Sequence, residues 1–399
     1  MTPPLPIGQV LAATMATQAL TTFGMLAMAA VAPRAAEDLG VSPALVGYQV
    51  SAVYGTAMVS ALISGAFARR TGATLASQWA LCLVAAGTLL TALGQPLAIA
   101  LGALVIGGGY GLTNAAASQL LSRAPTARNM NFLFSLKQSG VPLGGVLAGA
   151  LLPPLTVAFG WRAALAVCAL LILGVGLLLE LRRRSWDCDR DPSARVLAAP
   201  FASVAIVWRH AILRWISISS FAYSAVQLCL TGFLVTYLVV DARVDLLAAG
   251  TVLSLTHAAG AIGRLFWGWL ADRLRSGSAA LAINGALSIA GAFAASAIEV
   301  GWSFSAIALT CVFLGFCAMG WNGVFVAVIA RQAPAGHIGI ATGGSLVVTY
   351  AGILFGPAAF AAAHAAGMSY GSGFAVLGVV SAVGVAGVLR ARRYIGKVS

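Results

Sequence analysis

Charged residues are scarce in this chain, and acidic residues are the scarcest of them. Asp, Glu, Lys and Arg make up 8% of the 399 residues, against roughly a quarter in an average soluble domain. Only 10 residues are acidic, and none of these stands in the middle of an apolar run. Hydrophobic residues account for 60% of the chain. This composition excludes an ordinary soluble domain and indicates a protein that crosses the membrane several times.

The sequence also lacks motifs of ATP-driven and enzymatic chemistry. It contains no GxxxxGK(S/T) phosphate loop and no HExxH zinc motif. The 6 cysteines are scattered without the spacing of metal ligands, and they predict no disulfide framework. We therefore expect neither an enzyme nor a cofactor or metal site.

Apolar runs of about 20 residues are long enough to cross a bilayer, because a helix rises ~1.5 Å per residue and the hydrocarbon core is ~30 Å thick. Twelve such runs are predicted, at residues 8–32, 43–68, 73–93, 97–122, 130–157, 161–181, 215–240, 246–270, 277–298, 302–330, 338–364 and 369–389. The first run lacks a basic n-region and a small-residue cleavage site, so we expect a span there rather than a signal peptide.

Basic residues are distributed unevenly between the loops. With the N-terminus in the cytoplasm, the inner loops hold 18 of the 23 Lys and Arg residues, the outer loops hold three, and two lie inside spans. This asymmetry follows the positive-inside rule and predicts both termini in the cytoplasm. The net charge of +13 therefore reflects topology, and no nucleic-acid partner is expected. Nearly all basic residues are Arg, which favours a bacterial source and hence the inner membrane.

One long polar segment divides the chain. We expect an N-terminal bundle at 1–181, a cytoplasmic linker at 182–214 and a C-terminal bundle at 215–399. The second part of the linker is expected to lie along the membrane surface as an amphipathic segment.

The two bundles repeat each other at offsets that drift slowly along the chain. The aligned residues are Gly65 with Gly268 and Arg70 with Arg273 (offset 203), Gly107 with Gly315, Asn114 with Asn322 and Arg123 with Arg331 (offset 208), and Gly144 with Gly356 (offset 212). A duplicated six-helix unit is a known transporter architecture, in which the substrate binds near the bilayer midplane between the halves.

The motif WGWLADRLR (267–275) follows the eighth span. Together with the twelve spans and the long central loop, it resembles the major facilitator superfamily, and the resemblance covers essentially the whole chain. It implies an all-α integral membrane fold with twelve transmembrane helices in two pseudo-symmetric six-helix bundles. The loops after spans 2 and 8 of that family carry G-x-L-A-D-R/K-x-G-R-R or a degenerate form, which Gly268, Asp272 and Arg273 match.

The first copy of the motif departs from the family pattern. GAFARRTG (65–72) keeps Gly65 and Arg70, but Arg69 stands where the acid is expected. The resemblance implies that both copies help to gate transport, and Asp272 is then the acid expected to form a gating ion pair. The motif carries no information about the substrate.

Two further runs resemble one group within the superfamily. FSLKQSGVPLGG (134–145) and FGWRAAL (159–165) are similar to carriers of small organic anions, of the cyanate-permease and monocarboxylate types. The R-x-x-Q-G that drug antiporters often carry in span 4 is missing here. The resemblance therefore favours an anionic substrate.

Two cations stand inside apolar spans. Arg264 lies eight residues before Asp272 and hence ~12 Å inside the cytoplasmic end of its span, and Lys137 lies at a similar depth in the fifth span. A charge at the bilayer centre costs ~2.5–3.5 kcal/mol on insertion scales, so it normally faces a cavity or a partner. In the family fold spans 5 and 8 face each other, which implies that an anion binds between the two cations. Snorkelling to the membrane surface is the structural alternative for both.

Other polar and aromatic residues are candidates for the same substrate site. They are the aligned pair Asn114 and Asn322, the aromatic residues Tyr54 and Trp321, and His257, which lies seven residues before Arg264. The asparagines could instead bond neighbouring helices, and the aromatic rings could serve packing. His257 is the candidate proton carrier, because its unperturbed pKa is close to neutral. A buried, neutral, hydrogen-bonded imidazole is the alternative.

We predict a monomeric secondary transporter that moves a small organic anion, a carboxylate, across the lipid bilayer by alternating access. Arg264 and Lys137 are expected to hold the substrate. A coupling proton, exchange and facilitated movement all stay open. The alternative function is proton-coupled efflux of drugs or metabolites, which predicts an acid in the first span, where Gln18 and threonines stand. A receptor that kept this fold would need a signalling domain, and we expect none.

Overall fold

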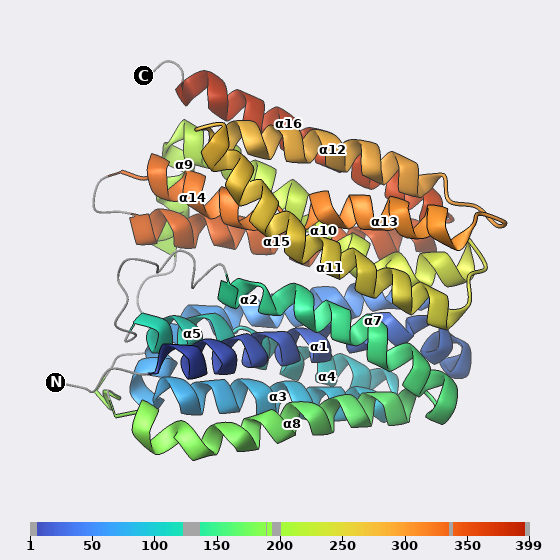
Figure 1. Ribbon diagram of the computed structural model, residues 1–399, viewed down its shortest axis with the longest axis horizontal. Coiled ribbons are helices and arrows are strands. Elements are labelled where there is room, and N and C mark those ends of the chain that lie inside the picture. Colours follow the sequence, from blue (N-terminus) through green and yellow to red (C-terminus); the bar gives the residue numbers. More distant parts are fainter. Residues whose placement is uncertain (1–5, 123–135, 189, 194–200, 335–337, 396–399) are drawn as a thin grey trace. The chain divides into compact units, whose positions relative to one another are not determined.

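The computed structural model describes residues 6–122, 136–188, 190–193, 201–334 and 338–395 (Figure 1). All regular elements in these ranges are helices. Eleven helical stretches in these ranges, two of them made of two consecutive helices, are long and apolar enough to cross a membrane. Pro43–Ala61 and Ile63–Thr71, which meet at a 52° bend, give a twelfth span when they are counted together. The predicted all-α membrane fold is confirmed. Arg123 and residues 130–135, the start of the predicted fifth span, lie outside the described residues.

The chain folds into two compact units. Unit 1 comprises Met1–Pro43 and Ala52–Ala198, and unit 2 comprises Ala44–Ser51 and Ala199–Ser399. A short turn of 3₁₀ helix, Pro43–Leu45, precedes α2. Unit 1 contains α1 (Ile7–Leu39), most of α2 (Val46–Thr71), α3 (Ala73–Ala92), α4 (Pro96–Tyr110), α5 (Thr113–Ser122), α7 (Gly140–Phe159) and α8 (Trp161–Trp186). Unit 2 contains α9 (Phe201–Arg209), α10 (Ala211–Val240), α11 (Leu246–Arg273), α12 (Gly277–Ser296), α13 (Phe304–Ala318), α14 (Asn322–Gln332), α15 (Ile338–Ala365) and α16 (Tyr370–Ile395).

Much of the segment 182–214, expected to be a linker, is helical. α8 continues to Trp186, and α10 already begins at Ala211. Between them, α9 packs Ile206 and Val207 into the hydrophobic core of unit 2, while Trp208 is exposed. One side of α9 is therefore covered by helices of its own unit, and its other side exposes Trp208.

Neighbouring helices within each unit run side by side, such as α3 with α8 and α12 with α16 (Figure 1). Lipid tails are as apolar as the side chains, so helices in a bilayer associate through close packing. Glycines permit this approach. A Cβ atom on Gly107 of α4 would overlap the carbonyl oxygen of Val53 on α2, and one on Gly144 of α7 would overlap that of Ala19 on α1.

The same kind of crossing recurs in unit 2. A Cβ atom on Gly315 of α13 would lie 2.5 Å from the carbonyl oxygen of Thr256 on α11. Gly315 and Thr256 correspond to Gly107 and Val53 at the offsets of 208 and 203 found in the sequence. This crossing therefore occurs at equivalent positions of both units, as the predicted internal repeat requires.

Two adjacent glycines of α4 test this packing. A Cβ atom on Gly107 meets the backbone of α2, whereas one on Gly108 meets nothing within 4 Å. We expect Gly107→Ala to lower the free energy of unfolding by ~1–3 kcal/mol through overpacking. Gly108→Ala should leave it unchanged or raise it by up to ~1 kcal/mol, because alanine favours a helix. Thermal unfolding of both purified variants in detergent measures the difference, and equal stabilities would contradict the crossing.

Candidate functional site

Two spans are interrupted at equivalent positions. In unit 1, α4 ends at Tyr110 and α5 begins at Thr113, and in unit 2, α13 ends at Ala318 and α14 begins at Asn322. The offset of 208 carries Tyr110 onto Ala318, so the interruption belongs to the duplicated unit. Glycine-rich sequence accompanies both interruptions, and glycine is less favourable than alanine in a helix by ~1 kcal/mol.

The interruption in unit 2 presents carbonyl oxygens that side chains satisfy. The amide of Gly320 bonds only three residues back, to the carbonyl of Cys317 at 3.1 Å. That carbonyl also accepts from Asn284 Nδ2 at 2.9 Å, and the Met319 carbonyl accepts from Arg264 Nε at 3.2 Å. No water reaches the backbone inside a hydrocarbon core, so such carbonyls need donors from the protein. Half-buried Arg264 is therefore tied to the backbone of the interrupted span.

Gln227 of α10 holds the start of α14. Its Oε1 accepts from Trp321 Nε1 and from Asn322 Nδ2, each at 3.1 Å. Asn322 Nδ2 also lies 3.4 Å from the Met319 carbonyl that Arg264 uses. Trp321 is 1% exposed and packs in the hydrophobic core of unit 2. The structure thus brings Arg264, Asn322 and Trp321 together around one interruption.

His257 lies on α11, nearly two helical turns before Arg264. It is 3% exposed, and neither ring nitrogen has a hydrogen-bond partner among the described residues. Seven residues are close to two turns, so the two side chains leave the same side of the helix. Buried polar atoms in proteins are normally hydrogen-bonded, so the unsatisfied imidazole requires an explanation.

Two amide side chains anchor Lys137 in unit 1. The lysine is 3% exposed, and its Nζ donates to Asn114 Oδ1 at 2.6 Å and to Gln138 Oε1 at 3.1 Å. Such burial does not fit a side chain that snorkels to the surface. Asn114 is the second residue of α5, so the ammonium lies near a helix start, where the backbone carries partial positive charge. The two positive contributions together favour an anion.

Two more side chains of unit 1 lie near these groups. Tyr54 packs edge-on against Tyr110, the last residue of α4, with ring centroids 5.7 Å apart. Gln18 of α1 is buried, and neither amide atom has a partner among the described residues. A Cβ atom on Gly140, three residues after Lys137, would lie 2.9 Å from Gln18 Cβ. The sequence drew attention to Gln18 only because an acid is absent there, and its buried amide now makes it a candidate for substrate contact.

The candidate site is a set of cations and amides. Lys137 belongs to unit 1 and Arg264 to unit 2, and each lies beside the interruption of its own unit. That both line a single cavity stays a prediction. In the described part of the chain, no group of three or more His, Cys, Asp or Glu side chains is placed to hold a metal ion. The chemistry available around both interruptions is hydrogen bonding and charge, which suits the binding of a polar anion.

The pattern of the Major Facilitator Superfamily matches residues 14–357. The chain belongs to this superfamily. An MFS-type transporter of Gibberella moniliformis (strain M3125 / FGSC 7600) is 29% identical over 269 residues, and the match covers 65% of this chain but only 60% of that protein. A gallate transporter of Pseudomonas putida is 25% identical over 331 residues, which cover 75% of this chain and 72% of that protein.

Solved structures share the superfamily fold. A bacterial homolog of the human lysosomal transporter Spinster, in an inward-facing and unoccupied conformation, superposes with a TM-score of 0.72 at 17% identity. The superposition covers 96% of this chain and 94% of that one. The superposition confirms the predicted fold, and the family match over residues 14–357 confirms the predicted family. The protein is a multi-pass membrane transporter of the major facilitator superfamily.

The superfamily motif is intact in unit 2. Gly268, Asp272 and Arg273 form the last turns of α11, and Asp272 Oδ1 lies 3.9 Å from Nη2 of Arg331. Both side chains of this ion pair are exposed. An exposed pair contributes only ~0–1 kcal/mol, so it can break at little cost when the protein changes conformation.

The first copy of the motif ends α2 without an acid. Gly65 and Arg70 lie in the last two turns of α2, and Arg69 stands at the acid position. The segment that follows α8 contacts the end of α2, because the amide of Asp191 donates to the carbonyl of Arg69 at 2.8 Å. Hydrogen bonds from Ser193 hold the pKa of the Asp191 carboxyl below its ordinary value. A negative charge is thereby kept beside the arginines.

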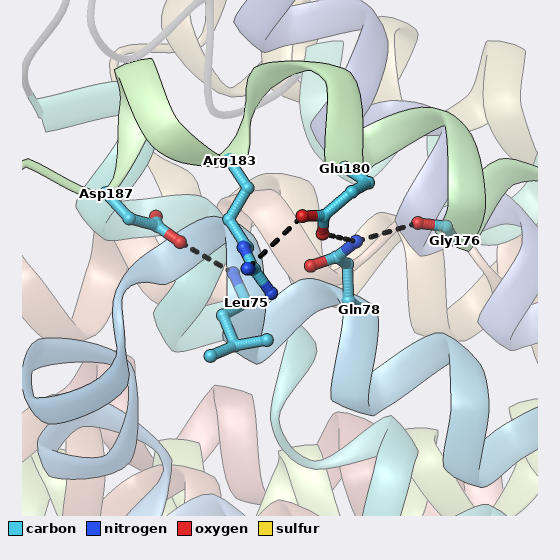
Figure 2. Close-up of polar contacts among 6 residues, drawn as sticks. All are labelled: Leu75, Gln78, Gly176, Glu180, Arg183 and Asp187. Carbon is cyan, nitrogen blue, oxygen red and sulfur yellow. Dashed lines mark hydrogen bonds and ion pairs between the residues drawn. The ribbon is translucent and has the colours of Figure 1, made fainter.

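Asp187, directly after α8, caps the start of α3. Its carboxylate accepts from the amides of Thr74 and Leu75 at 2.7 and 2.9 Å, whereas Gly72 at the N-cap has no side chain to offer. A carboxylate there also interacts favourably with the helix dipole. Figure 2 shows a polar row that continues between α8 and α3 through Arg183, Glu180, Gln78 and the carbonyl of Gly176. An acid from a distant segment thus caps the helix that follows the loop in which the motif acid is missing.

Removing the carboxylate of Asp187, which caps α3, should lower the stability of the protein. Asp187→Ala should lower the free energy of unfolding by ~0.5–2 kcal/mol, and Asp187→Asn should lower it less, because asparagine also caps helices. Asp191→Ala is the matched control: its carboxylate bonds Ser193 locally, and the change should stay within ~0.5 kcal/mol. Thermal unfolding in detergent ranks the three variants. An Asp187→Ala protein as stable as this control would show that the cap contributes nothing.

The bond between Lys137 and Asn114 predicts an energetic coupling. A double-mutant cycle of Lys137→Met and Asn114→Ala should give a coupling energy of ~1.5–3 kcal/mol, as for hydrogen bonds to charged groups. Thr113→Val provides the control, since the Thr113 hydroxyl bonds the carbonyl of Tyr110 and not the lysine. That second cycle should be additive within ~0.5 kcal/mol. Additivity in both cycles would rule out a stabilising bond to Lys137.

Proposed function

We propose that this transporter moves a small organic anion, a carboxylate, by alternating access. One observation carries the proposal: each unit has a membrane-embedded cation beside its interrupted span, Lys137 with Asn114 and Arg264 with Met319. A guanidinium can bind a carboxylate through two parallel hydrogen bonds, and an ammonium acts as a point charge. Half-helices whose N-termini face anionic substrate groups are a recurring device in transporters.

A finer proposal is that the carboxylate is aromatic. The likeness to a gallate transporter supports it. The amide side chains around the two cations, Asn114, Gln227 and Asn322, supply donors and acceptors for polar substituents on such a ring. A few placed polar groups in otherwise apolar surroundings are typical of small-molecule sites.

We further propose that the protein works as a monomer in an inner membrane with both termini in the cytoplasm. The uneven distribution of basic residues between the predicted loops supports this orientation. A proton, carried by the substrate or by His257, is the candidate coupling ion. Reconstitution into vesicles of defined orientation, with and without a pH gradient, tests that coupling.

Ligand-dependent thermal unfolding tests the substrate class. The purified protein in detergent is screened against benzoate, pyruvate, inorganic phosphate, glucose and a quaternary ammonium drug. A ligand that binds only the folded state stabilises it by ~2.7 kcal/mol at a hundredfold excess over Kd. We expect carboxylates to raise the unfolding temperature of the wild type, and Arg264→Gln and Lys137→Gln to lose this response.

The controls separate binding from folding. Glutamine at position 264 can still donate to the Met319 carbonyl, so the interrupted span keeps that bond. Arg392→Gln, at an exposed position of α16, removes a positive charge elsewhere and should keep the full response. Equal stabilisation of wild type and both variants by the ammonium compound, with no effect of carboxylates, would replace this proposal with drug efflux.

A further inference from the structure

His257 is a buried side chain whose missing hydrogen bonds the proposed function leaves unexplained. A neutral imidazole has one donor and one acceptor nitrogen, and both are unsatisfied among the described residues. Leaving them so is unfavourable for the folded protein, because a buried polar group that lacks a partner has lost its bonds to water. Thr256, its neighbour in sequence, shows the usual solution, with its hydroxyl bonded to the Val252 carbonyl at 2.7 Å. A ligand from outside the chain could satisfy both nitrogens of His257.

The Arg264 side chain reaches back along α11 toward His257. Its Nε donates to the carbonyl of Met319. The Met319 side chain packs against Gly260, and its Sδ lies 2.6 Å from the position that a Cβ atom on this glycine would take. Gly260 is three residues after His257, which corresponds to ~4.5 Å along the helix axis. The seven residues from His257 to Arg264 rise ~10.5 Å, and side chains on a helix lean toward its N-terminus, so a ligand that contacts both side chains must extend along α11.

This spacing selects among carboxylates. A hydroxyl beside the carboxylate, as in a 2-hydroxy acid or an ortho-hydroxybenzoate, stays at the carboxylate end. A hydroxyl on the far side of an aromatic ring is held away from the carboxylate by the full width of the ring, so such a molecule is extended in the way that contact with both side chains requires. The imidazole can accept from such a phenol and donate to a second one beside it.

We propose that His257 is a specificity-determining residue, which hydrogen-bonds the para hydroxyl of an aromatic carboxylate whose carboxylate group is held by Arg264. This inference rests on the proposed function and names the substrate more closely: a para-hydroxylated benzoate. His257 then selects between substrates, and Arg264 provides the binding that all carboxylates share.

Binding of three matched compounds tests the inference. Dissociation constants of benzoate, 2-hydroxybenzoate and 4-hydroxybenzoate are measured by calorimetry on the full chain in detergent. We expect the wild type to bind 4-hydroxybenzoate about tenfold more tightly than benzoate, and 2-hydroxybenzoate about as weakly as benzoate. His257→Leu should lose the preference and keep its affinity for benzoate. His257→Gln should keep part of the preference, and Thr256→Val all of it.

The outcomes separate the inference from the function on which it rests. If the wild type binds benzoate and 4-hydroxybenzoate equally, or if His257→Leu keeps the preference, the role of His257 is overturned while carboxylate transport stands. Equal preference for the 2- and 4-hydroxy isomers overturns the spacing. If none of the three binds the wild type, this inference and the proposal of an aromatic carboxylate fail, and the response to pyruvate in the thermal screen decides whether carboxylate transport stands. Should His257→Leu not fold, the partial preference of His257→Gln decides between the first two results.

Discussion

A backbone carbonyl inside a membrane must find a donor within the protein, and the polar architecture of this transporter follows from that requirement. In a continuous helical span, the carbonyls find these donors in the backbone amides of the same helix. The interrupted span α13–α14 does not provide all of them, and its carbonyls at Cys317 and Met319 accept from Asn284 and Arg264 on neighbouring helices. Two of the polar side chains in this apolar unit are thus placed by the backbone, before any substrate is considered.

The two units meet the requirement differently at equivalent positions. In unit 1 the residue equivalent to Met319 is Gly111, and a Cβ atom there would overlap Ser60 and the carbonyl of Ala57 on α2. The helices touch here, and the short hydroxyl of Ser60 on α2 donates to the carbonyl of Gly107 at 3.4 Å. In unit 2 a larger residue fills the place of Gly111, and a long polar side chain, Arg264, bonds its carbonyl. Duplication therefore supplies the scaffold, and the residues that differ between its copies supply the chemistry.

This division also explains how much the sequence could predict. Spans follow from hydropathy, and helix crossings follow from glycine spacing, because each depends on a local property of the chain. Side-chain partners between helices depend on the rotation and height of one helix relative to another, which neither pattern encodes. Lys137 and Asn114 were each recognised as candidates, but their bond was not.

Asp187 is another residue whose partners the sequence did not predict, and here the partners lie far apart along the chain. The sequence revealed that an acid is missing beside Arg70, and only the fold shows that an acid more than a hundred residues away caps the following helix. No periodicity or motif connects the two segments, since the contact arises from the packing of α8 on α3. The motif alone therefore does not show which acid lies at this end of unit 1.

Arg264 combines a structural bond with a proposed role in substrate binding, and the combination has a consequence. A guanidinium has five N–H donors, so a carboxylate can be bound while Nε stays on the Met319 carbonyl. The substrate would then be held by a side chain that also sets the geometry of the interrupted span. Alternating access requires that the substrate interact differently with different conformations of the protein, because a ligand shifts an equilibrium only by its differential affinity. A cation bonded to the irregular turn between α13 and α14 offers such a difference, because any rearrangement of that turn moves the Met319 carbonyl and with it the guanidinium.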